Sequence, residues 1–150
     1  MKPIIQKQYR DKINQLLELP PIERPPEGWV RTFRKALGMS SRQLAARLNL
    51  SKPSVTQMER MEVEDRITLT QLRRVAQALD AKLVYALVPR QPLDTVLDKQ
   101  ATRKAQELVS RADTQMQLEK QQLGAEEIQQ LIRQEAQRLL DTMPRDFWDD

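Results

Sequence analysis

Residues 44–62 read LAARLNLSKPSVTQMERME, and a helical pattern of apolar residues is interrupted in the middle of this stretch. Asn49, Ser51 and Pro53 break the pattern, which resumes at once through Val55 and Met58. The interruption is short enough for a tight turn but too short for a longer loop. The stretch therefore predicts two short helices that meet at a tight turn and cross.

Four positions in this stretch carry the steric pattern, namely Ala45, Asn49, Val55 and Met58. The small side chain of Ala45 lets the following helix cross closely, and Asn49 tolerates left-handed backbone geometry at the turn. Val55 and Met58 are expected to face inward and to hold the second helix against the first. This spacing is typical of a helix-turn-helix.

The second of these helices carries most of the candidate DNA-binding side chains. Ser51 can cap it by accepting the N–H of Ser54, and Pro53 in the first turn loses little by lacking an N–H. Gln can bond adenine through two hydrogen bonds, while Arg and Lys reach guanine or phosphate. Arg42 and Gln43, at the start of the preceding helix, are predicted to hold phosphate, although Gln43 can also be only a cap. The predicted DNA-binding residues are Arg42, Gln43, Ser51, Lys52, Ser54, Gln57 and Arg60.

The helix pair sits within a predicted group of four short helices between residues 29 and 79. Gly38 is placed to end the first of them, WVRTFRKALG. The second and the fourth begin with capping-box spacing, from Ser40 to Gln43 and from Thr68 to Gln71.

The segment KLVYALVP, residues 82–89, is dense in β-formers and ends at proline, so it predicts the one strand of the chain. A single strand cannot satisfy its own backbone groups. The economical partner is the same strand of a second copy, although a different protein could also supply it. The predicted dimerisation residues are Leu83, Val84, Tyr85, Ala86, Leu87 and Val88.

Helical extensions are predicted on both sides of this central region. An amphipathic helix over residues 3–18 is followed by PPIERPPEG, whose four prolines make a stiff connector. After Pro92 a long helix is expected to about Gln121, and Gly124 separates it from a last helix that Pro144 ends. The chain is therefore predicted to be mainly α-helical, divided into residues 1–27, 28–80, 81–90 and 91–150.

The composition argues against an enzyme. Cysteine and histidine are absent and only 3 glycines are present, so no disulfide, imidazole base or phosphate-binding loop can be built. No cofactor and no metal is expected. Acid pairs such as Glu62 with Glu64, or Glu126 with Glu127, are most simply read as solvated helix ends. No stretch is apolar enough to cross a membrane, so a soluble cytoplasmic protein is expected.

The charge is uneven along the chain. Residues 28–90 hold 12 Lys and Arg against 5 Asp and Glu, whereas residues 91–150 hold 8 against 12. A basic segment around a helix-turn-helix predicts double-stranded DNA as the partner, although a basic surface can also be only solvated. A dimer would place two such helices in successive major grooves about 34 Å apart, which predicts a pseudo-palindromic operator.

A protein-binding module is the alternative function. It rests on the acidic helices after residue 90 and on Phe147 and Trp148, which are candidates for binding a partner. Both aromatic residues can instead pack back on the body of the protein, and the helices can simply extend the core.

Residues 29–79 resemble the Xre or phage-repressor type of helix-turn-helix domain, in which SRQLAARLNLSKPSVTQMER forms the second and third helices. Asn49 stands where that family often has Gly, and Lys52 where Gln is frequent. Motifs within and outside this domain extend the likeness over most of the chain. RPPEGWVRTFRKALGMSSRQLAARL, ITLTQLRRVAQAL, LVYALVPR and DFWDD together resemble the bacterial family called mobile mystery protein A.

This resemblance implies an antitoxin-like repressor, encoded beside a Fic-domain protein whose shared operon it controls. Fic enzymes transfer nucleotide monophosphates to proteins, and some are restrained by a helix with Ser or Thr, three residues, Glu, then Gly or Asn. The sequence contains no such motif. Restraint of a Fic partner would therefore need another mechanism. Repression of the shared operon does not require this motif.

Overall fold

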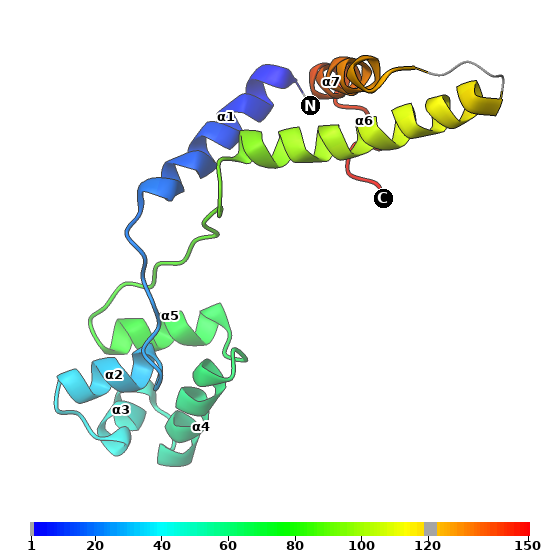
Figure 1. Ribbon diagram of the computed structural model, residues 1–150. Coiled ribbons are helices and arrows are strands. Elements are labelled where there is room, and N and C mark those ends of the chain that lie inside the picture. The colour runs from blue at the N-terminus through cyan, green and yellow to red at the C-terminus, as the bar shows by residue number, and fades with distance from the viewer. Residues whose placement is uncertain (1, 119–122) are drawn as a thin grey trace. The chain divides into compact units, whose positions relative to one another are not determined.

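The computed structural model describes residues 2–118 and 123–150, without the side chain of Gln117. These residues form two compact units (Figure 1), one of residues 20–87 and one that joins the residues up to 19 with those from 88 onward. The described ranges contain seven α-helices, a short 3-10 helix and no strand. The prediction of a mainly helical protein is confirmed.

The unit of residues 20–87 is a four-helix domain. Its helices are α2 (Trp29–Ala36), α3 (Ser41–Leu48), α4 (Lys52–Val63) and α5 (Leu69–Ala78). Helix α4 contacts both α2 and α3, and α3 also contacts α5. The helices bury a shared apolar core of Val30, Leu44, Ala45, Val55, Met58, Val75 and Leu79.

The predicted helix ends of this unit are confirmed. Ser40 and Gln43 form a capping box at the start of α3, as do Thr68 and Gln71 at the start of α5. Gly38 follows α2 with a φ of +64°, a conformation that glycine adopts without steric cost.

The other unit contains α1 (Pro3–Asn14), the 3-10 helix (Gln15–Glu18), α6 (Leu93–Leu118) and α7 (Ala125–Thr142). The end of α1 is tied to the start of α6, because Asn14 Oδ1 accepts the N–H of Leu93 at 2.9 Å. Gly124 precedes α7, as predicted, while the expected continuation of the long helix to about Gln121 lies outside the described residues. Helices α6 and α7 pack through Ala101, Ala105, Val109, Ile132, Ala136 and Leu139, and Phe147 from the segment after α7 joins this core.

The predicted strand over residues 82–88 is absent from the single chain. The segment leaves α5 without helix, turn or strand, and its Val84 and Leu87 side chains are 77% and 88% exposed. A strand forms only when a second strand pairs with its backbone, and the described part of the chain supplies none. Pairing with a second copy through Leu83, Val84, Tyr85, Ala86, Leu87 and Val88 stays a prediction.

Candidate nucleic-acid interface

The turn between α3 and α4 has the predicted geometry. Asn49 adopts left-handed geometry with a φ of 55°, and the N–H of Leu50 bonds the carbonyl of Ala45 at 2.9 Å. Ser51 Oγ accepts the N–H of Ser54 at 3.3 Å and so caps α4. Val55 and Met58 are buried at 1% and 7% exposure. Helix α4 therefore leaves the turn with its apolar side held against the core.

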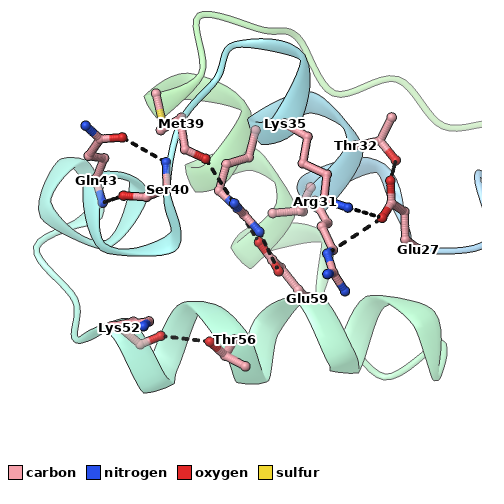
Figure 2. Close-up of polar contacts among 12 residues, drawn as sticks. Glu27, Arg31, Thr32, Lys35, Met39, Ser40, Gln43, Lys52, Thr56 and Glu59 are labelled. Carbon is pink, nitrogen blue, oxygen red and sulfur yellow. Dashed lines mark hydrogen bonds and ion pairs between the residues drawn. The ribbon is translucent and has the colours of Figure 1, made fainter.

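A buried ion pair fixes α4 against α2. Arg34 donates two hydrogen bonds to Glu59, from Nε at 2.7 Å and from Nη2 at 3.3 Å, and a third from Nη1 to the carbonyl of Met39 at 2.9 Å. Figure 2 shows Glu59 and Met39 at this contact, beside the Ser40 and Gln43 cap. Because buried charges are stable only when paired, this contact restricts α4 to one position.

Glu62 makes a second link between the same two helices. Its carboxylate accepts the N–H of Trp29 at 2.8 Å and that of Val30 at 2.9 Å, and the residue is only 3% exposed. These are free N–H groups at the start of α2, where a negative charge is favoured. The prediction of a solvated helix end is therefore wrong for Glu62, although Glu126 and Glu127 are indeed exposed in the first turn of α7.

Gly28 permits this approach. It has a φ of +88°, and a Cβ at this position would lie 2.7 Å from Glu62 Oε1. Any other residue would meet both the unfavourable backbone geometry and the carboxylate.

The proline-rich connector is tied to the end of α4 as well. Arg24 Nη1 bonds the carbonyl of Glu62 at 2.7 Å and Asp65 Oδ1 at 2.6 Å, and its Nη2 bonds the carbonyl of Val63 at 3.2 Å. A cation at a helix C-terminus is favoured by the helix dipole and satisfies carbonyls that lack a partner. The connector before α2 is therefore attached to the C-terminal end of α4.

Three long side chains of α4 are open to solvent. Lys52, Gln57 and Arg60 are exposed, and within the described residues no hydrogen bond or ion pair engages their side chains. Gln57 and Arg60 lie roughly across the helix from Val55 and Glu62, since residues follow one another at about 100° around an α-helix, while Lys52 stands in the first turn. These three side chains can therefore reach a ligand without first breaking a contact.

The other predicted DNA-binding residues are placed less simply. Ser54 is half-buried, and its hydroxyl lies 2.7 Å from that of Ser51, so the two hydroxyls engage each other. Arg42 is exposed on α3. Gln43 uses its Oε1 to accept the Ser40 N–H at 2.8 Å, which confirms its role as a cap and leaves its amide N–H groups for another partner.

Thr56 was not among the predicted residues. It is exposed beside Gln57, and its hydroxyl donates to the carbonyl of Lys52 at 3.3 Å (Figure 2). It stands four residues from both Lys52 and Arg60, and this spacing along one strip of the helix was the signal that could have found it.

Part of the basic charge of this unit is already paired. Glu27 accepts a hydrogen bond from Lys35 at 2.9 Å and lies 3.6 Å from the Arg31 guanidinium, as Figure 2 shows. The Lys35 ammonium holds the pKa of Glu27 below its usual value. Arg31 and Lys35 therefore contribute less positive charge than Arg42, Lys52 and Arg60.

Comparison with known protein families supports this geometry. Residues 30–85 match the helix-turn-helix family model HTH_3, so the chain carries an Xre-type helix-turn-helix domain over this range. The matched range contains nearly all of α2 and the whole of α3, α4 and α5, and ends at Tyr85. The family consists of DNA-binding regulatory domains, which implies DNA as a partner and a role in transcription. Comparison with curated proteins and with solved structures gave no match.

The described residues form neither a membrane-spanning helix nor a metal-binding cluster. Within residues 2–118 and 123–150, no helix is long and apolar enough to cross a membrane. In the same ranges, no cluster of three or more Asp and Glu side chains is arranged to hold a metal ion.

The aromatic tail is divided between core and surface. Phe147 is 1% exposed in the α6–α7 core, and its carbonyl accepts a hydrogen bond from Gln100 at 2.7 Å. It therefore offers no surface to a partner, as the packing alternative anticipated. Trp148 is 55% exposed and remains accessible.

Proposed function

We propose that the protein is a sequence-specific transcriptional repressor that binds double-stranded DNA as a homodimer in the cytoplasm. The observation that carries the proposal is the division of α4 between a buried side and an open side. Arg34 and α2 hold Glu59 and Glu62 on the buried side, while Gln57 and Arg60 on the other side, and Lys52 in the first turn, form no side-chain hydrogen bond or ion pair within the described residues. A rigid helix with long polar side chains on its open side suits a major groove.

The side chains divide between base reading and phosphate binding. Gln57 is the principal base reader because its amide can form two hydrogen bonds with adenine, and Lys52 reads guanine or binds phosphate. Ser51 and Ser54, at the start of α4, contribute short hydroxyl contacts. Arg42 and the free amide N–H groups of Gln43 bind DNA phosphates. Arg60 can bind a phosphate or read a base.

Repression of its own operon is the finer part of the proposal. Motifs that lie both within and outside residues 30–85 resemble mobile mystery protein A, which supports an antitoxin-like autoregulator encoded beside a Fic-domain protein. A pseudo-palindromic operator upstream of the shared genes would serve this role.

A partner-binding role of the C-terminal helices is the second candidate. A cavity of about 610 Å³ opens on the α6–α7 pair, and its lining combines apolar side chains such as Val109 and Met116 with polar ones such as Gln134 and Arg138. Leu108 and Leu131, also in its lining, are 42% and 39% exposed. Leu131→Glu should abolish capture of the co-expressed Fic-domain protein and leave operator binding intact. Unchanged capture would exclude this surface.

A footprint with the purified full chain on the DNA upstream of its own gene tests the main proposal. We expect protection of two related half-sites whose centres lie about 34 Å apart, or a whole number of such turns. Equal affinity for this region and for random DNA of the same length would refute sequence-specific repression.

A further inference from the structure

An apolar groove of about 370 Å³ lies on the surface of the unit of residues 20–87. It runs between α2 and α5 and continues along the chain that follows α5. Trp29 and Phe33 stand in its lining at 46% and 38% exposure, so two large aromatic side chains are left partly open to solvent. Its further lining includes Leu72, Ala76, Leu83 and Val84.

The chain beside the groove is apolar, and its backbone lacks partners. From Lys82 to Val88, no backbone hydrogen bond to another described residue is formed. Tyr85 is 64% exposed and Leu87 is 88% exposed. An exposed apolar segment with free N–H and C=O groups is a template for pairing with a second strand.

We propose that a second copy of this chain covers the groove, through antiparallel pairing of residues 83–87 about a two-fold axis at Tyr85. In this register Leu87 of the second copy lies directly opposite Leu83. Directly opposed side chains project from the same face of a two-stranded ribbon. Because Leu83 lines the groove, Leu87 of the second copy covers it beside Trp29 and Phe33.

The free backbone supports this register. The two-fold at Tyr85 confines the pairing to residues 83–87, whose backbone groups have no hydrogen-bond partner among the described residues. A two-fold at Val84 would set Leu87 opposite Ala81, whose N–H already bonds the carbonyl of Ala76 at 2.7 Å. A self-paired interface needs its projecting and receiving parts on the same surface, and Leu87 and the groove meet this condition.

The inference rests on the proposed function, since it supplies the homodimer that the two half-sites need. It adds the register of pairing, the groove as the receiving surface and Leu87 as the residue that fills it.

The register can be tested by cysteine cross-linking, because the chain contains no cysteine. In Tyr85→Cys the two thiols meet at the two-fold, within the Cα separation of about 4.4–6.8 Å that a disulfide spans. In the matched variant Leu87→Cys the two thiols are four strand residues apart, roughly 13 Å. We expect mild oxidation of the full chain to give a covalent dimer for Tyr85→Cys and for the double variant Leu83→Cys/Leu87→Cys, but not for Leu87→Cys alone. Equal cross-linking of the two single variants would overturn the register.

The groove is tested by Leu87→Glu, which places a charge against Trp29 and Phe33 of the second copy. Sedimentation of the full chain should show a dimer dissociation constant raised by about tenfold or more. Leu118→Glu is the control, because this side chain is 77% exposed and lies on α6, outside the groove. It should leave the dissociation constant unchanged. If Leu87→Glu dimerises like the parent chain, the groove assignment is overturned, while a specific footprint would still support repression. A dimer without operator selectivity would instead refute repression and leave the interface standing.

Discussion

Glu59 on α4 receives two hydrogen bonds from Arg34 on α2, at 2.7 and 3.3 Å, with both side chains about 10% exposed. The pair connects the proposed DNA-reading helix to the first helix of its domain from the side that faces away from DNA. The orientation of α4 therefore depends on a contact that no base or phosphate touches.

Arg34→Met should destabilise the domain by about 3–5 kcal/mol, because it leaves the Glu59 carboxylate buried without its partner. The double variant Arg34→Met/Glu59→Leu should recover most of this loss, since well-packed apolar side chains replace a buried ion pair at little cost. Native-state hydrogen exchange of the α4 amides measures the free energy of opening in this unit. A double variant as unstable as the single one would contradict the argument.

Gly28→Ala should destabilise the domain more than Gly38→Ala. Both glycines have a positive φ, at +88° and +64°, so both variants lose about 1 kcal/mol or more to backbone strain. Only at position 28 does the added Cβ also meet a neighbour, Glu62 Oε1 at 2.7 Å, whereas nothing lies within 4 Å at position 38. Urea unfolding of the two variants compares the costs, and equal midpoints would show that Glu62 moves aside freely.

Gln57→Ala should weaken operator binding by about 1–3 kcal/mol and leave binding to random DNA nearly unchanged, because Gln57 is the proposed base reader. Titration of both DNAs at one salt concentration measures the difference. Equal losses on the two DNAs would remove Gln57 as a base reader.

Arg42→Ala should weaken binding to operator and random DNA alike, because a phosphate contact carries no sequence information. The slope of log affinity against log salt should also fall by about one unit. Loss on the operator alone, with an unchanged salt slope, would assign Arg42 to base reading.

Lys35→Met should raise the pKa of Glu27 toward its usual value, since the Lys35 hydrogen bond is the main cause of the lowered pKa. A carboxylate with a lowered folded-state pKa stabilises the fold above its unfolded-state pKa, and this contribution is lost as pH falls through the folded value. The effect is small because Glu27 is solvated. Carboxyl NMR titration reads the pKa, with Lys7→Met, beside Asp11, as the control that should leave Glu27 unchanged.

Local chemistry let the helix-turn-helix be predicted in detail. The caps at Ser40, Ser51 and Thr68, the left-handed Asn49 and the inward Val55 and Met58 were predicted and are found. Each of these features depends on residues within one turn of helix or on the periodicity of one face. The sequence by itself therefore determined the helices of this domain, the starts of α3, α4 and α5, and which side of α4 packs inward.

Only the tertiary structure decided what holds α4 in place. Arg34 bonds Glu59 across 25 residues of the chain, and Arg24 bonds Asp65 across 41. Gly28 likewise lies against Glu62. No sequence periodicity connects positions so far apart. From the sequence, Glu62 resembled a solvated helix end, because exposed and buried carboxylates differ only in what folding brings beside them. The tertiary structure likewise placed Phe147 in the core and left residues 82–88 unpaired, since burial and strand pairing both depend on partners distant in the chain.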